Sequence, residues 1–215
     1  MFSGIGMGLS LQSPPPILKG ATANGNGGTL TLPSHSVGDL IILYASECNG
    51  GTGDAMTIPT ASGTVPTWTA IGSGGSTWYT HRMYYTVATA TNHTSGTWLY
   101  NCPLSAVVIS GQHVSNPIYN SAYAGGDAST TSVISASSMS GYSNSVVIFF
   151  FGQSHYSTGY CTTLAGGFTQ QVVSSLTDHM MIATKDNPGT SGGLAASGVN
   201  GWHYYTSASI QIAGN

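Results

Sequence analysis

The sequence predicts an all-β protein, an antiparallel two-sheet β-sandwich, on three observations. Two apolar runs about a hundred residues apart, Gly38–Glu47 and Asn144–Gly152, each follow a polar turn and contain the residues that favour strands. Further short runs follow at the spacing of roughly 8–12 residues that sandwiches use, with Gly, Pro and Asn between them. No segment shows helical periodicity. A jelly-roll-like arrangement is our expectation, and a closed barrel is the alternative.

The first half of the chain can be divided into elements by its turn residues. We expect a strand from Ile17, a turn at Gly25–Gly28, a strand at Thr29–Leu32, the buried strand from Gly38, a loop at Cys48–Gly63, strands at Pro66–Gly72 and Tyr79–Thr89, a hairpin return at Gly96–Tyr100 and a buried strand at Ser105–Ser110. The strand at Tyr79–Thr89 is the clearest, because its residues alternate between two faces and His81, Met83, Tyr85 and Val87 share one of them.

The second half repeats the plan of the first. Trp68-Thr69 is matched by Phe168-Thr169, Tyr85–Thr89 by Met180–Thr184 and Ala106–Gly111 by Ser209–Gly214, always in the same order. We therefore expect one domain at 20–215, built from pseudo-repeats at 20–118 and 119–215, with Trp68 and Phe168 in equivalent sites between the sheets. The alternative is that two unrelated all-β halves share turns and Val/Ile runs.

Residues 1–19 form an extended N-terminal arm that precedes the folded domain. Apolar side chains recur among its glycines, and the stiff Pro14-Pro15-Pro16 follows them. Such an arm can dock on a neighbouring subunit through Phe2, Ile5, Met7, Leu9 and Leu11. The alternative is that these residues form a disordered terminus that docks on nothing. The first residues also lack the pattern of a secretion signal.

Charge is scarce in this chain. Only 4% of the 215 residues are charged, three of them basic and six acidic, so the surface must consist of uncharged polar residues. A basic patch for nucleic acid and a charge run for anionic lipid are therefore not expected. The three cysteines are far apart and the seven histidines lack ligand spacing, which predicts neither a metal site nor a cofactor.

The sequence offers weak signals for catalysis. Asp178-His179 could belong to a nucleophilic triad, but no Gly-x-Ser-x-Gly motif accompanies it and neighbouring residues of a strand point to opposite faces. Asp39 stands where a turn residue that caps its own backbone is expected. We therefore expect no catalytic residues and no enzyme activity.

Aromatic residues beside glycine-rich loops are the best candidates for a binding site. Trp78, Tyr79, Trp202, Tyr204 and Tyr205 are of the types that stack on sugars or anchor protein interfaces. The alternative is that alternate members lie in the core and the others shield the sheet edges.

Several strand and turn motifs resemble a known family. Gly38-Asp39-Leu40-Ile41, Trp68-Thr69, Arg82–Ala88, Ser95–Trp98 and Asn116-Pro117-Ile118 resemble a domain of the structural proteins of tailed bacteriophages and their prophages, over residues 18 to 214. The resemblance implies a β-sandwich located in the virion, with no catalytic residue to carry over.

The resemblance leaves three functions open. We expect a non-enzymatic capsid decoration or cement protein that bridges neighbouring subunits, with other virion proteins (the major capsid or a tail protein) as partners and a homo-oligomeric state. The alternative is a tail-fibre, receptor-binding adhesin that binds a host surface glycan. A depolymerase is the third option. Since no heptad or repeated shaft supplies a stalk, the first is favoured.

Overall fold

A computed structural model describes most of the chain. The described residues are 14–24, 28–47, 58–75, 79–98, 103–128, 134–135, 144–153, 163–164, 166–174, 179–186, 195–197 and 203–215. Over these ranges the protein consists of strands and irregular connections, without a helix.

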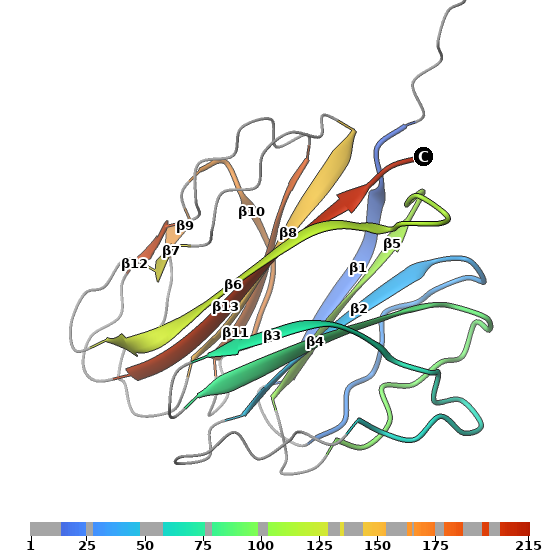
Figure 1. Cartoon of the computed structure of the whole chain (residues 1–215), viewed down its shortest axis with the longest axis horizontal. Coiled ribbons are helices and arrows are strands. Elements are labelled where there is room, and N and C mark those ends of the chain that lie inside the picture. Colours follow the sequence, from blue (N-terminus) through green and yellow to red (C-terminus); the bar gives the residue numbers. More distant parts are fainter. Residues whose placement is uncertain are drawn as a thin grey trace, which may run out of the picture.

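Two five-stranded antiparallel sheets pack face to face (Figure 1). Sheet I has the order β1-β5-β2-β4-β3, with bounds β1 Ile17–Asn24, β2 Leu40–Glu47, β3 Thr69–Gly75, β4 Thr80–Val87 and β5 Leu104–Ser110. Sheet II has the order β10-β11-β8-β13-β6, with bounds β6 Ile118–Ala128, β8 Ser145–Gln153, β10 Thr169–Ser174, β11 His179–Asp186 and β13 His203–Ala213. A small third sheet contains β7 (Ile134–Ser135), β12 (Ala195–Ser197) and β9 (Thr163–Leu164). The predicted two-sheet sandwich is confirmed, and neither sheet closes into a barrel.

The internal repeat is visible in the topology. When β6, β8, β10, β11 and β13 are matched in chain order with β1 to β5, the two sheets have the same strand order. In a jelly roll both sheets take strands from both halves of the chain, whereas here each half completes its own sheet. The connectivity is therefore that of one five-stranded unit used twice.

The β-bulges extend this match to single residues. In sheet I the register shifts at Lys19 in β1 and at Ile71 in β3. In sheet II it shifts at Tyr119 in β6 and at Gln171 in β10, which are the corresponding strands. Bulges at the same places in both halves are what a duplicated unit should retain.

One predicted residue match was wrong. Thr69 pairs with Tyr85 in sheet I, and Thr169 pairs with Thr184 in sheet II, so Tyr85 corresponds to Thr184 rather than to Met180. The sequence comparison aligned the apolar ends of two strands, and only the strand pairing shows the shift. The match of Ala106–Gly111 with Ser209–Gly214 agrees with the register, since Leu40 pairs with Ile109 and Val146 with Ile212.

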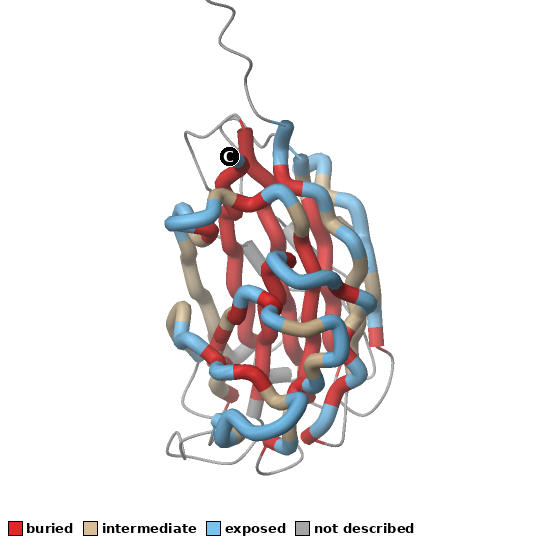
Figure 2. Tube along the Cα trace, turned by 90° about the vertical axis from the view of Figure 1, so that its right-hand side faces the viewer, coloured by how far each residue is buried: buried red, intermediate tan, exposed pale blue. Residues whose placement is uncertain are grey.

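The main core lies between the two sheets. It contains alternate residues of the central strands, among them Ile42 on β2, Ile148 on β8 and Ile210 on β13, all fully buried. Tyr44 and Phe150 hold corresponding positions and stack, with ring centroids 5.5 Å apart and planes 5° from parallel. Corresponding residues meet in this way where an approximate two-fold axis relates two sheets. Figure 2 shows the buried strands in the middle of the molecule and the exposed residues in its turns.

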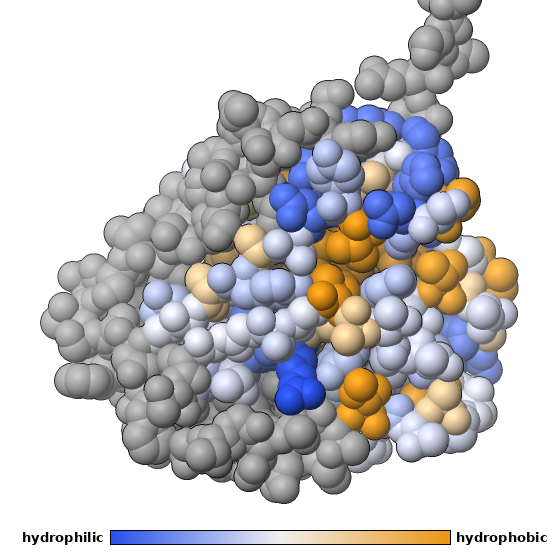
Figure 3. Space-filling model, in the orientation of Figure 1, coloured by the Kyte–Doolittle hydropathy of each residue, from blue (hydrophilic) through white to orange (hydrophobic). Residues whose placement is uncertain are grey.

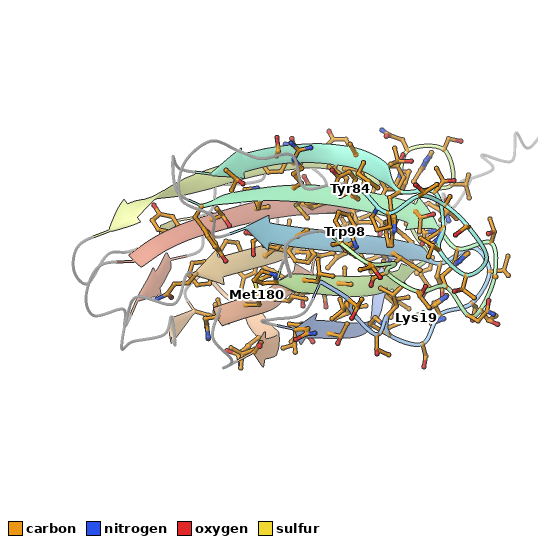
Figure 4. The ribbon with its side chains drawn as sticks, turned by 90° about the horizontal axis from the view of Figure 1, so that it is seen from below. Lys19, Tyr84, Trp98 and Met180 are labelled. Atoms are coloured by element: carbon orange, nitrogen blue, oxygen red, sulfur yellow. The ribbon has the colours of Figure 1, made fainter. Side chains whose placement is uncertain are left out.

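The outer faces of the sheets are covered as well. On sheet I, Leu30, Leu32, Trp68 and Trp98 from the connections pack on alternate residues of β2, β4 and β5. Tyr84 and Trp98 lie side by side there, with centroids 5.2 Å apart, while Met180 belongs to the core between the sheets (Figure 4). The central strands are therefore buried on both faces, as their continuous apolar runs predicted.

This arrangement corrects the expected position of the two large aromatics. Trp68 and Phe168 hold corresponding positions, one residue before β3 and β10, but each covers the outer face of its own sheet rather than the space between the sheets. Phe168 is only half-buried and packs near Phe149 and Phe151. The sequence pattern predicts that the central strands are apolar on both faces, but it does not indicate which face packs against the other sheet.

Three boundaries also differ from those expected. The segments at Thr29–Leu32 and at Gly96–Trp98 are not strands, because their side chains pack down on sheet I and their backbone bonds to other loops. Leu30 N–H donates to Ser95 Oγ at 2.9 Å, and Trp98 N–H donates to the Gly28 carbonyl at 2.7 Å. In addition, β1 begins at Ile17, as expected for this strand, and the boundary that changes is the end of the predicted arm at residue 19, which lies inside β1.

Candidate functional site

Many of the predicted site residues lie outside the described ranges. These are the arm residues Phe2, Ile5, Met7, Leu9 and Leu11, the aromatics Trp78 and Trp202, the cysteines Cys48, Cys102 and Cys161, and Asp178. Tyr204 lies in β13, but its side chain is outside the description too. Their predicted roles remain predictions.

The prediction that Tyr79 contacts a ligand or partner at the surface is wrong. Its side chain is 0% exposed, and its hydroxyl forms a 3.1 Å hydrogen bond with Ser46 Oγ between the sheets. The period-two pattern of the strand contained this signal, because Tyr79 has the same parity as the buried His81 and Met83. Tyr205 is half-buried and packs against the outer-face cluster of Phe149 and Phe151, so most of its ring is not available either.

A polar cluster closes the core at the end where β2 finishes. His81 on β4 is fully buried between Tyr44, at 5.0 Å between ring centroids, and Tyr123 of β6, at 5.5 Å. Neither ring nitrogen of His81 has a hydrogen-bond partner among the described residues. Burial consequently lowers the pKa of His81 from 6.5 to about 3, so the ring is neutral at pH 7.

The tyrosines of this cluster are also held in their neutral form. Burial raises the pKa of Tyr44 far above its ordinary value, and its hydrogen bond with Thr206 on β13 opposes only part of that effect. Burial likewise raises the pKa of Tyr123, against a smaller opposite effect of the Ser121 hydroxyl. The cluster therefore presents no charged group, which does not suit it to acid–base catalysis at neutral pH.

Two other residues considered for catalysis, His179 and Asp39, pack or form hydrogen bonds within the fold. His179 lies on the outer face of sheet II, 4% exposed, with its ring 6.2 Å from Phe151. Asp39 caps its turn as expected, because its Oδ2 accepts the Ser36 N–H at 2.6 Å and also pairs with Lys19 at 2.5 Å. Across the described residues, no group of three His, Cys, Asp or Glu side chains could hold a metal ion.

Two histidines brace loops by accepting backbone hydrogen bonds. His93 Nε2 accepts the N–H groups of Thr89 and Ala90, at 3.1 and 3.2 Å. His113 Nδ1 accepts those of Ser115 and Asn116, at 3.3 and 3.1 Å, and so shapes the connection between the two halves of the chain.

That connection forms one wall of a surface groove. The groove has a volume of about 360 Å³, and sheet I contributes Ala70, Ile71 and Tyr85 to it while the start of sheet II contributes the run Ser115–Ser121. Figure 3 shows hydrophobic atoms between β3 and β6, bordered by more polar ones. We call this feature the β3–β6 groove; sequence reasoning did not identify it.

A second hollow, of about 660 Å³, lies over the loops that cover sheet I. Its described lining is rich in hydroxyl groups, including Thr22, Thr31 and Thr97, and its one ring among those residues is the imidazole of His93. It differs from the β3–β6 groove, whose described lining contains the rings of Tyr85 and Tyr119.

Exposed apolar side chains gather at one end of the sandwich. We call it the arm end, because residues 14–16 lead into β1 there, close to the C-terminus (Figure 1). Its exposed residues are Ile17, Val37, Val87, Val114 and Tyr119, five of the seven large exposed hydrophobic residues in the described ranges. Strand pairing places these residues at the same end of their sheets. In sheet I, Ile17 pairs with Ser110, and Leu40 pairs with both Val87 and Ile109. In sheet II, Ile118, the neighbour of Tyr119, pairs with Ile212.

Comparisons with family models, with curated proteins and with solved structures gave no match in any of the three. Over the described residues, the chain contains no helix long and apolar enough to cross a membrane. The resemblance of its motifs to phage structural proteins therefore stays a prediction.

Proposed function

We propose that the protein is a non-enzymatic structural component of a bacteriophage virion, a decoration or cement protein that docks through its arm end. The observation that carries the proposal is the concentration of exposed apolar side chains at that end, with Val114 80% exposed and Val37 65% exposed. A group of exposed apolar residues on an otherwise polar surface is typical of a protein interface.

The electrostatics of the arm end support a lasting contact. Lys19 and Asp39 lie there and neutralise each other at 2.5 Å. Interface cores are depleted in charged residues, and a chain with 4% charged residues has little long-range field to steer a transient encounter. The virion setting comes from the resemblance to phage structural proteins, which makes other virion proteins and further copies of this chain the partners.

The place where the arm joins the sandwich fits this role. Because residues 14–16 reach the sandwich at the arm end, residues 1–13 are tethered beside the apolar group and can extend the same contact. Burying four apolar side chains of the arm would contribute on the order of 6 kcal/mol before ordering costs, at about 1.5 kcal/mol each.

The experiment compares incorporation into particles of the full chain and of two variants. Deletion of residues 1–13, or Val114→Asp at the arm end, should abolish co-sedimentation with particles while leaving the melting temperature nearly unchanged. Val173→Asp is the matched control, because Val173 is an exposed valine, 42% exposed, on β10 and away from the arm end. Full incorporation of both the deletion and Val114→Asp would rule out docking through the arm end.

A further inference from the structure

The β3–β6 groove differs sharply from its counterpart on the opposite edge of the sandwich. The repeat relates Ile71, Tyr85 and Tyr119 of the groove to Gln171, Thr184 and Lys19. At the counterpart, these groups are satisfied within the protein: Gln171 Nε2 donates to Thr184 Oγ1 at 2.7 Å, and Lys19 pairs with Asp39. In the groove the same positions carry two aromatic rings and an isoleucine.

The β-bulges explain how these side chains come to line a groove. Ile71 and Tyr119 are the bulged residues of β3 and β6, and a bulge redirects the side chain of the extra residue. Tyr119 is 47% exposed as a result, whereas Tyr85 lies in the regular part of β4 and is half-buried. The groove thus has one firmly seated ring and one accessible ring.

The polar groups of the lining are uncharged hydrogen-bonding groups. Asn116 and Asn120 carry carboxamides, and Ser115 and Ser121 carry hydroxyls, while none of the described residues that line the groove is charged. The Asn120 carboxamide is oriented, because its Oδ1 accepts the Ser121 N–H at 2.8 Å. His113 fixes the beginning of the same wall through the backbone of Ser115 and Asn116.

We propose that the β3–β6 groove is a binding site for a neutral saccharide. The apolar C–H face of a pyranose ring packs on an aromatic ring such as Tyr119, and its hydroxyls pair with carboxamides and hydroxyls that both donate and accept. The absence of charge in the lining favours a neutral sugar over a sialylated or sulfated one. A volume of about 360 Å³ is at the lower end of the range for small-molecule sites, and suits one or two sugar rings.

The site is independent of docking through the arm end. A concave groove lined by hydrogen-bonding groups differs from the protruding Val114, and the two can be separated by mutation. Because Tyr119 is also one of the exposed residues of the arm end, the separating variant is Asn120→Ala, which removes a carboxamide from the lining of the groove. It should reduce sugar binding and leave incorporation into particles intact, whereas Val114→Asp should have the opposite effect.

The test titrates the full chain with neutral hexasaccharides of glucose, mannose and galactose, using saturation-transfer NMR and then calorimetry. At least one sugar should bind, and Tyr119→Ala should weaken it about tenfold or more, because the stacked ring and its buried area are lost. Tyr119→Phe keeps the ring and should bind within about twofold of wild type, as should the control Val173→Ala, whose side chain lies on β10.

A decaproline peptide forms a second arm of the same experiment, because tyrosine-lined grooves also bind extended proline-rich peptides. Binding of the peptide without any of the sugars would overturn the proposal, and so would sugar binding that Tyr119→Ala leaves unchanged. Failure of all probes to bind, with the thermal unfolding of the protein normal, would overturn it as well.

Discussion

The buried His81 should make the stability of the protein depend on pH. Its folded pKa of about 3 lies well below the ordinary 6.5, so between these values the unfolded chain binds a proton that the folded protein does not. The free energy of unfolding therefore falls as the pH is lowered through this window, by about 1.4 kcal/mol per pH unit. From pH 7 to pH 4.5 the expected loss is on the order of 2–3 kcal/mol, a large part of the roughly 5–15 kcal/mol typical of a domain.

The surroundings of His81 support this sign. The titratable groups that face it are Tyr44 on β2 and Tyr123 on β6, and burial keeps both in their neutral form in the acid range. No carboxylate among the described residues lies against the ring to stabilise its protonated form. The penalty for protonating it is thus the cost of burying an unpaired cation.

The repeat supplies a matched variant. His81 corresponds to Met180, which is fully buried at the equivalent position of sheet II. His81→Met should preserve the packing and remove the contribution of this group, so its urea-unfolding free energy should change less between pH 7 and pH 4.5 than that of wild type. Parallel curves for the two proteins would refute the assignment.

Two further predictions concern packing. Trp98→Ala should lower the free energy of unfolding by about 3–5 kcal/mol, because the side chain is 1% exposed where it packs on sheet I. Phe168→Ala should lower it less, because the ring of Phe168 is half-buried. Thermal or urea unfolding of the two variants tests this ranking. Gly125→Ala should cost about 1–3 kcal/mol, because a Cβ there would lie 2.6 Å from the Cα of Gly75 where β6 passes β3; an unchanged unfolding midpoint would contradict that close approach.

The central strands could be predicted from the sequence, but the elements that pack on each of their faces could not. The runs from Leu40 and Val146 predict buried strands because apolar residues on both parities require a cover on both faces. They do not indicate which face packs against the other sheet, so the sequence alone does not show that Trp68 lies on the outer face of sheet I. The segment around Leu30 alternates between buried and exposed residues as a strand does, so its sequence predicts a strand, although in the structure it pairs with none.

The β3–β6 groove was beyond the reach of the sequence for a different reason. Tyr119 and Ile71 are placed by β-bulges, and each bulge shifts the alternation of faces by one residue. Their positions in the chain therefore gave no sign that they meet across two sheets. Tyr79, in contrast, could have been placed in the core from the alternation that it shares with His81 and Met83.

We propose that this protein is a structural component of a virion that docks through its arm end. The most direct measurement is immunogold electron microscopy of density-gradient-purified particles from the native source, with an antibody raised against the full chain. We expect regularly spaced label on the capsid surface, lost when residues 1–13 are deleted. Label confined to tail fibres would contradict the decoration role, and particles without label would contradict a virion location altogether.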